Sequence, residues 1–429
     1  MVESAPGERY DKVKDHLWIW AHDAVFYGSG AGLPGVAHMT PIEGAFFMGI
    51  PNVMFIRYQG IPEPPFEQYT VPFRSLRSFE WSLLNNSNQT SHLGAEQEHV
   101  YRLAAKHPNM TGVIMDDFII RPGGEATAGP WLADNNPRFP VVLSLRLPEP
   151  CHVTSIELTQ TSWPSGDYRT GRFEVEGSSD GSLWKQVFKG EMPNTPGAQV
   201  NIPLGDMMLS SLRIRVLSTH DTSGSASCGL GSIRLLNGDS PVPINDAIVS
   251  ATSEYPTHGS TCLTLKPGEK RVILPKLMLT PEELGKARKR LDNIDGRRLD
   301  LSVVVYTHQM EASLAHMLDA CDVILLWTWR PEDIKNMPAN LAKARRLFPG
   351  KRIKLGCYMW DFSVGKPLPM ELMKWQCDFA LRSLKAGEIE GIIFLGTNIC
   401  DLGIDTVEWT REWVLRVGET PLGGTTGDL

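Results

Sequence analysis

The chain has 429 residues, of which 42% are hydrophobic and 21% are charged, and its formal net charge is −7. This composition is typical of a globular protein too long for one ordinary core, so we expect a large domain plus a smaller one. The acidic balance argues against a nucleic-acid-binding face, because no Lys/Arg-rich run of the kind that binds phosphate backbones occurs. No apolar stretch of about 18 residues occurs, which excludes a membrane-spanning helix.

The N-terminal segment and the cysteines add two expectations. The segment MVESAPGERYDKVKDH is polar and lacks the apolar middle of a signal peptide. We therefore expect a cytoplasmic protein, or a secreted or periplasmic one if a signal has been removed. Seven scattered cysteines without a CxxC pair predict reduced, mostly buried thiols.

The first part of the chain predicts strands with helices between them. Strands are expected at 17–22, 50–58, 76–84 and 110–119. A helix is expected after Thr40, which can cap it, with Pro41 in its first position and Glu43 completing a capping box. A second helix is expected at 94–108, where apolar residues recur at helical spacing and a proline ends the run.

The alternation resumes at Thr280, where TPEELGKARKRLDN repeats the same capping pattern and predicts a helix. Four more apolar strands are expected at 299–309, 321–329, 351–362 and 389–398, each followed by an amphipathic helix. Eight near-continuous apolar strands that mostly alternate with helices require a parallel sheet covered by helices. The predicted fold class is therefore α/β, with a closed (β/α)8 TIM barrel.

The segment between the two halves has a different texture, with short alternating strands separated by Gly, Pro, Ser and Asp. This pattern is typical of an antiparallel β-sandwich. FPVVLSLRLPEPCHVTSIELTQ, GRFEVEGSSDGSLWKQV and SSLRIRVLSTHDTSGSASCGLGSIRLLN resemble a discoidin (coagulation factor 5/8 type C) module, and EGSSDGSLWKQV is similar to that family's S-x-D-G-x-x-W turn. The resemblance implies a jelly-roll sandwich that binds glycans, lipids or proteins. The expected domains are 1–121 and 276–429 for the barrel and 122–275 for the sandwich inserted after strand 4.

The stretch MTGVIMDDFI places Asp116 and Asp117 at the end of the fourth strand. Reactive groups of such barrels lie at the C-terminal ends of the strands, so this pair is a candidate catalytic centre. Two neighbouring carboxyl groups push their pKa values apart, which keeps one of them protonated near neutral pH. We expect Asp117 to be the acid/base and either Glu80 or Asp361 to be the opposing nucleophile or base. The structural interpretation is that one Asp caps the following loop while the other binds an Arg or backbone amides.

The other strand ends are rich in polar and aromatic residues. The candidate substrate-binding residues are His22, Asp23, Arg57, Tyr58, Trp81, Tyr306, His308, Trp327, Trp329, Tyr358, Trp360 and Asn398. Aromatic faces stack on the C–H surface of a pyranose, while acids and amides bind its hydroxyls. The predicted function is therefore a glycoside hydrolase with a carbohydrate substrate, helped by the inserted module as a carbohydrate-binding part. No cofactor is predicted, and the oligomeric state is left open.

A second resemblance concerns the Asp pair. GVIMDDF resembles the fourth-strand Asp-Asp motif of substrate-assisted N-acetylhexosaminidases of the O-GlcNAcase-like family. There the first Asp orients the acetamido group and the second is the acid/base, which implies these roles for Asp116 and Asp117. More broadly, the barrel resembles bacterial glycosidase-like proteins.

Two alternatives remain open. A metal-dependent barrel enzyme that acts on sugars would use His22, Asp23, Asp117, His308 and Asp361 as ligands, although the first strand carries no HxH. A non-catalytic carbohydrate-binding protein would use the barrel as a scaffold. It predicts sugar binding that survives Asp116→Asn and Asp117→Asn, without turnover.

Overall fold

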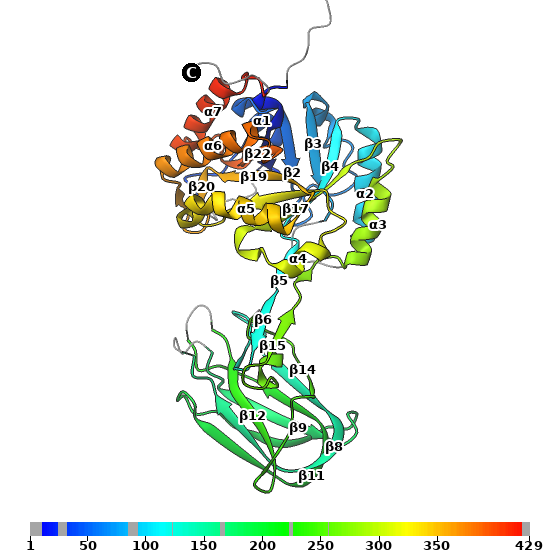
Figure 1. Cartoon of the computed structure of the whole chain (residues 1–429), viewed down its shortest axis with the longest axis vertical. Helices are drawn as coiled ribbons and strands as arrows, with labels where there is room; N and C mark the ends of the chain where they lie inside the picture. The colour runs from blue at the N-terminus through cyan, green and yellow to red at the C-terminus, as the bar shows by residue number, and fades with distance from the viewer. Residues whose placement is uncertain are drawn as a thin grey trace, which may run out of the picture. The chain divides into compact units, whose positions relative to one another are not determined.

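The structure is a computed structural model that describes residues 11–24, 32–84, 93–121, 123–163, 168–222, 226–255 and 257–422. It divides into two compact units, residues 1–120 together with 276–429, and residues 121–275 (Figure 1). Across these described ranges, no helix is long and apolar enough to cross a bilayer.

The first unit contains a closed barrel of parallel strands, as the apolar runs predict. In order around the barrel the strands are β1 (Leu17–Ala21), β2 (Asn52–Phe55), β3 (Ser78–Ser82), β4 (Met110–Met115), β17 (Asp300–Tyr306), β18 (Val323–Trp327), β19 (Arg352–Tyr358) and β22 (Gly391–Leu395). β1 closes the barrel against β22, with Leu17 opposite Ile392. All strands are parallel, so their C-terminal ends meet at one end of the barrel.

Helices connect most of these strands. They are α1 (Pro41–Met48), α2 (Leu93–Lys106), α3 (Pro281–Leu291), α4 (Ala312–Met317), α5 (Met337–Leu347), α6 (Met370–Lys385) and α7 (Asp405–Val417). Between β2 and β3 the described chain forms a 3-10 helix, η3 (Val71–Ser75), instead of an α-helix. The predicted capping boxes are present at Thr40 and Thr280, whose hydroxyls accept hydrogen bonds from the backbone N–H groups of Glu43 and Glu283.

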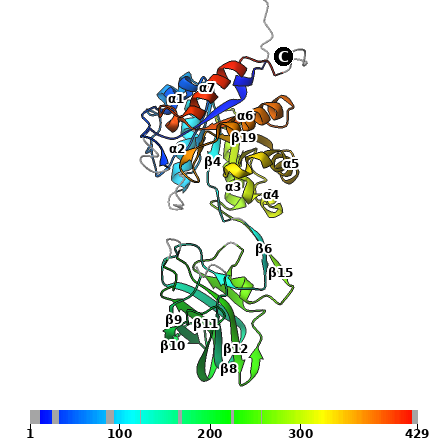
Figure 2. The ribbon, with the colours of Figure 1, turned by 90° about the vertical axis from the view of Figure 1, so that its left-hand side faces the viewer.

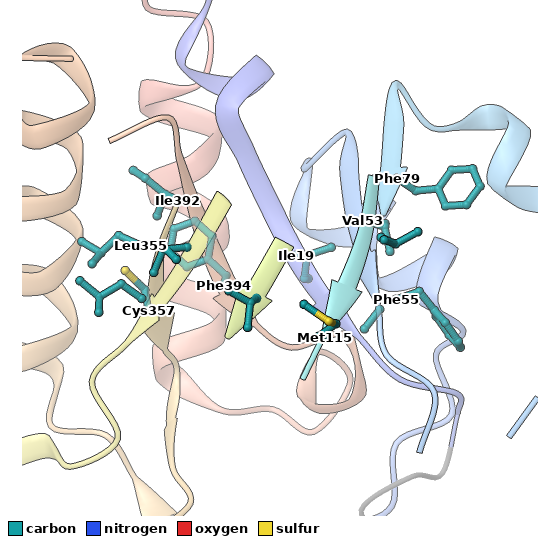
Figure 3. Close-up of a cluster of buried hydrophobic side chains, with 14 of the residues drawn as sticks. Ile19, Val53, Phe55, Phe79, Met115, Leu355, Cys357, Ile392 and Phe394 are labelled. Carbon is teal, nitrogen blue, oxygen red and sulfur yellow. The ribbon is translucent and has the colours of Figure 1, made fainter. Parts of the chain in front are cut away.

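A large apolar core lies between the strands and the helices. Figure 3 shows strand side chains of this core, among them Ile19, Val53, Met115 and Phe394. These side chains alternate along each strand with those that point into the barrel. The helices contribute apolar residues such as Leu284 to the same cluster, so burial of this layer stabilises both the strands and their covering helices.

A second, smaller apolar cluster fills the barrel interior. It consists of Trp18, Trp20, Met54, Ile114, Val304, Val323, Leu325, Trp327, Tyr358, Ile393 and Leu395 from the strands, together with Ile56, which directly follows β2. The Trp327 indole lies over Gly356 of the neighbouring strand: a Cβ added to Gly356 would be 2.1 Å from Trp327 Cε3. The glycine therefore provides the space that this ring occupies.

Gly356→Ala is expected to destabilise the barrel, because the added methyl group would displace the Trp327 ring from a packed interior. Overpacking of this kind costs about 1–3 kcal/mol of unfolding free energy. Urea unfolding followed by tryptophan fluorescence measures the loss. Gly350→Ala is a comparison in a turn where an added Cβ meets nothing within 4 Å, although its φ of 76° adds backbone strain there. An unchanged stability of Gly356→Ala would contradict the packing described.

A cluster of polar side chains, Glu80, Lys354 and Ser302, lies within the barrel interior. The Glu80 carboxylate is 2.5 Å from Lys354 Nζ, and both side chains are 1% exposed. Ser302 Oγ donates a hydrogen bond of 2.7 Å to the other oxygen of Glu80. The Lys354 ammonium also lies 3.9 Å from the centre of the Trp18 ring. Gly112 faces this group, since a Cβ there would be 3.2 Å from Glu80 Cδ.

The second unit is an antiparallel β structure, as the alternating pattern of the inserted segment predicts. Its strands are ordered β10 (Lys185–Glu191), β9 (Arg172–Ser178), β11 (Gln199–Val216), β8 (Val141–Gln160), β12 (Gly229–Asn237) and β13 (Ser240–Val242), with β14 (Ile248–Ala251) beside β8 and β7 (Trp131–Leu132) beside β12. Figure 2 shows β8, β9, β11 and β12 alongside one another. The long strands β8 and β11 pair along both of their halves, with shifts in register where they bend.

The bends let this sheet enclose its own apolar core. Leu143, Leu158, Ile214 and Leu235 belong to this core. In the first half of β8 and the second half of β11, inward apolar residues alternate with outward polar ones such as Ser144 and Arg213. The outward face of this half of the sheet is therefore polar.

Candidate active site at the C-terminal ends of the barrel strands

The Asp pair lies directly beyond β4, which ends at Met115. Asp116 continues the inward register of Gly112 and Ile114 and is 9% exposed. Asp117 is exposed and has a φ of 45°, in the left-handed region that Asp tolerates better than most residues. The strand geometry therefore ends between the two residues, so the alternation of strand side chains does not force the two carboxylates apart.

Tyr306, the last residue of β17, joins the pair. Its hydroxyl donates a hydrogen bond of 3.1 Å to Asp117 Oδ1. Burial first, and then the charges of Tyr358, Asp116 and Asp117, raise the pKa of the Tyr306 phenol well above its usual value. The phenol is therefore protonated at neutral pH and acts as a donor to Asp117.

Aromatic rings surround Tyr306. His308 stacks on it with ring centres 5.7 Å apart, and Trp329 approaches it edge-on at 6.0 Å. Trp329 also lies 5.8 Å from Tyr358 and is 38% exposed. Trp327 packs beneath them against Tyr358 at 5.0 Å. The exposed ring of Trp329 can therefore stack on a sugar, while Trp327 supports the cluster from the barrel interior.

The ends of β18 and β22, which lie on either side of β19, carry buried polar atoms without a hydrogen-bond partner among the described residues. They are Trp327 Nε1, Thr328 Oγ1, Thr397 Oγ1 and both polar atoms of Asn398. Asn398 is only 1% exposed and lies in the turn that follows β22. Buried polar atoms are nearly always satisfied, so these donors and acceptors are available for water or a ligand hydroxyl.

His22 and Asp23 follow β1. His22 Nδ1 is 3.2 Å from the carbonyl oxygen of Ile56, and burial lowers the pKa of the imidazole to about 3. Asp23 accepts a hydrogen bond of 2.6 Å from the Tyr69 hydroxyl. Asp23 is therefore already engaged in holding the chain just before η3, whereas His22 is a buried neutral imidazole.

The neutral His22 predicts a loss of stability in acid. The unfolded imidazole binds a proton below a pH of about 6.5, while the folded one stays neutral down to a pH of about 3. The unfolding free energy should thus fall by up to about 1.4 kcal/mol per pH unit in this window. Urea titrations at pH 7 and 5 on wild type and His22→Gln measure it. Equal losses of stability in both proteins would contradict the prediction.

Two of the predicted catalytic carboxylates, Glu80 and Asp361, have structural partners. Glu80 was expected at a strand end, but it is inside the barrel in the ion pair with Lys354. Asp361 shapes its own turn: its Oδ1 accepts hydrogen bonds from the N–H of Ser363 at 2.9 Å and from the Ser363 hydroxyl at 2.6 Å. Each carboxylate thus has a structural partner that accounts for its position.

Three predicted substrate-binding residues, Arg57, Trp81 and Trp360, take structural positions. The buried Arg57 guanidinium donates to the carbonyl oxygens of Gly60 and Pro62, both at 3.0 Å, and so fixes the loop after β2. The backbone carbonyl of Tyr58 accepts from Ile61 in the same loop. Trp81 and Trp360 belong to the outer core between strands and helices. Trp81 alternates with the inward Glu80, whereas Trp360 lies beyond the end of β19 at Tyr358, where the barrel-strand alternation no longer applies. Trp20 and Phe362, which were not predicted as site residues, contact the aromatic cluster through Trp327 and Tyr358.

In the described part of the chain, no three His, Cys, Asp or Glu side chains come together as a potential metal-binding group. His22, Asp23, Asp117, His308 and Asp361, the ligand set of the metal-dependent alternative, therefore do not form one cluster there.

The fold defines the chain as a closed parallel β-barrel with an inserted antiparallel β-sandwich. No protein-family profile matches the sequence, and no curated protein sequence matches it either. The Clostridium perfringens module CpGH89CBM32-5, solved in complex with GalNAc-β-1,3-galactose, is 10% identical with a TM-score of 0.20, over 22% of this chain and 65% of that one.

Two other solved structures are similar to this chain to the same extent. The family 32 carbohydrate-binding module of Streptococcus pneumoniae EndoD is 13% identical with a TM-score of 0.20, over 22% of this chain and 68% of that one. A chitosan-binding module from a Paenibacillus chitosanase/glucanase is 12% identical with a TM-score of 0.21, over 25% of this chain and 76% of that one.

Proposed function

We propose that the protein is a glycoside hydrolase whose acid/base is Asp117, at the C-terminal end of β4. The observation that carries this proposal is the Asp116–Asp117 pair beside a protonated tyrosine, with Tyr306 donating to Asp117 at 3.1 Å. The aromatic cluster of Tyr306, Trp329 and Tyr358 supplies the stacking surface that a sugar ring requires.

We infer a substrate-assisted mechanism on an N-acetylhexosaminide. The two residues predicted to oppose Asp117, Glu80 and Asp361, are held by Lys354 and Ser363. Their engagement favours a nucleophile that the substrate itself brings, its acetamido group. The resemblance of GVIMDDF to the motif of substrate-assisted hexosaminidases agrees with this choice.

The proposed roles follow the chemistry of each group. Asp116 accepts a hydrogen bond from the acetamido N–H and directs its carbonyl oxygen to the anomeric carbon. As that C–O bond forms, the glycosidic C–O bond breaks and Asp117 donates a proton to the leaving oxygen. Water then opens the cyclic intermediate while Asp117 takes back a proton. Asn398, whose two polar side-chain atoms have no hydrogen-bond partner among the described residues, and Trp329 would bind the sugar.

In this proposal the inserted sandwich is a carbohydrate-binding module that keeps the enzyme on its glycan. Linking a binding module to a catalytic domain raises the effective concentration of substrate without any new contact at the active site. The resemblance of the EGSSDGSLWKQV segment to a discoidin module supports this role.

The test is hydrolysis of a panel of aryl glycosides by the wild-type protein, with N-acetylhexosaminides beside the corresponding hexosides. Turnover confined to N-acetylated sugars is the expected result. Turnover of plain hexosides alone would contradict the substrate-assisted mechanism. Silence across the panel, together with sugars that raise the melting temperature equally in wild type and Asp116→Asn, would instead establish a non-catalytic binding protein.

A further inference from the structure

The outward face of the sandwich contains a hollow of about 550 Å³. Residues of three neighbouring strands form its floor. Ser144 of β8 lies between Ser250 of β14 and Arg213 of β11, each of which is directly opposite it in register. The turn between β9 and β10 forms one wall, and Trp184 follows this turn. Its volume lies within the range of small-molecule sites, about 300–1,000 Å³.

Two arginines line this hollow, and neither forms an ion pair with a carboxylate of the described residues. The Arg213 guanidinium is 3.7 Å from the centre of the Trp184 ring, which holds it in a defined position. Arg146 is exposed at the hollow, one strand away in the register opposite Ser211. Stacking on Trp184 leaves the N–H groups at the edge of the Arg213 plane able to donate.

Other arginine and glutamate side chains on the same face form ion pairs with each other. Arg215, two residues beyond Arg213, lies 2.9 Å from Glu174 and 3.6 Å from Glu176. Glu176 is directly opposite Arg213 in register, yet it approaches Arg215. Asp180, the carboxylate that lines the hollow, accepts hydrogen bonds from the N–H groups of Ser182 at 2.8 Å and Leu183 at 2.9 Å, so it is bound to its own turn.

We propose that this hollow binds an acidic sugar unit, in which Arg213 and Arg146 hold a carboxylate or sulfate group. Guanidinium groups bind such planar or tetrahedral anions through paired N–H donors. The serines that line the hollow supply hydrogen bonds for sugar hydroxyls, and the exposed Ile248, which also lines it, offers apolar contact for C–H groups. This inference deepens the proposed function by naming the glycan class that the module would select, and it rests on that module binding carbohydrate.

Isothermal titration of the full chain tests it with four probes: a galacturonate trisaccharide, its carboxyl-reduced neutral form, a sulfated galactose trisaccharide and inorganic sulfate. Arg213→Gln and Arg146→Gln should each weaken binding of an acidic trisaccharide about 10–100-fold, the value of one charged hydrogen bond. Arg234→Gln is the matched control, because Arg234 pairs with Glu157 at 3.0 Å on β12. The neutral trisaccharide should bind at least about tenfold more weakly than the acidic one.

Several outcomes would overturn the proposal. Equal weakening in Arg234→Gln would show general charge attraction, and sulfate alone binding as tightly as the trisaccharide would show an anion site without sugar recognition. If Arg213→Gln lowers the melting temperature, Arg213→Lys is the alternative variant. It keeps the positive charge but lacks the paired N–H donors of the guanidinium, so it should still weaken binding. If the acidic trisaccharides do not bind but aryl glycosides are still hydrolysed, only the acidic-sugar site is refuted. If they bind but no glycoside is hydrolysed, only the proposed catalysis is refuted.

Discussion

Asp117→Asn is expected to lower the turnover of an aryl N-acetylhexosaminide about 10²–10⁴-fold, the usual contribution of a general acid. An amide has the size of the carboxyl group but cannot deliver the proton that the leaving oxygen needs. Tyr306 can still donate to the amide oxygen, so the position of the side chain should be kept. The loss should therefore fall on kcat while binding of the sugar persists.

Leaving-group dependence separates an acid from a merely structural residue. A leaving group that departs readily, such as a nitrophenolate with several nitro groups, needs little protonation, so the defect of Asp117→Asn should shrink with it. Asp319→Asn is the matched control, an exposed aspartate that precedes β18 at the opposite, N-terminal end of the strand. A defect that is the same for every leaving group, or one shared by Asp319→Asn, would be incompatible with Asp117 as the acid.

Much of the fold could be predicted because the barrel strands are continuous apolar runs. Strands buried on both faces show no polar alternation, so runs such as VILLW in β18 identify themselves by composition. The closed barrel and the antiparallel structure of the insertion are confirmed by the strand pairing. The change to alternating residues in the insertion reflects a sheet with one polar face, as Ser144 and Arg213 illustrate.

The face of each strand residue could not be predicted by the same reasoning. Strand alternation predicts one side of the barrel for both Tyr358 and Trp360, but β19 ends at Tyr358, and an apolar run does not reveal where its strand ends. The structure separates them into the interior cluster and the outer core. Likewise, Trp81, which was predicted to bind substrate, packs among Phe55, Phe66 and Phe73 in the outer core.

The position of a polar residue beyond a strand was predictable only where it follows the strand directly and has a short side chain. Asp116 and Asp117 meet that condition and do lie beside Tyr306. Arg57 also follows a strand, but a long flexible side chain can turn back to carbonyl groups of its own loop, and it does so. The buried pair of Glu80 and Lys354 had one usable signal in the sequence: each is a charged residue in the middle of its strand, with apolar neighbours on both sides.

Lys354→Met is expected to lower the unfolding free energy by about 3–5 kcal/mol, the usual cost of leaving a buried charge without its partner. Methionine fills a similar volume, so the loss reports the orphaned Glu80 carboxylate more than a cavity. Ser302 would still donate at 2.7 Å, but one neutral hydrogen bond does not offset the desolvation of a charge at 1% exposure. Urea unfolding measures the change, with the exposed Lys289→Met as control.

The pH dependence of the same variant gives an independent test. Burial raises the pKa of Glu80 while Lys354 and Ser302 oppose that rise, so removing Lys354 should raise the pKa further. A carboxyl group whose folded pKa exceeds its unfolded value of about 4.3 is most favourable below that pH, and its contribution is lost as pH rises through the folded value. The loss of unfolding free energy of Lys354→Met, measured against wild type at the same pH, should thus be smaller at pH 5 than at pH 7. Glu80→Gln combined with Lys354→Met should recover part of the loss and abolish the pH difference. If the double variant were no more stable than Lys354→Met, the cost would lie in packing around Trp18 instead of in the unpaired carboxylate.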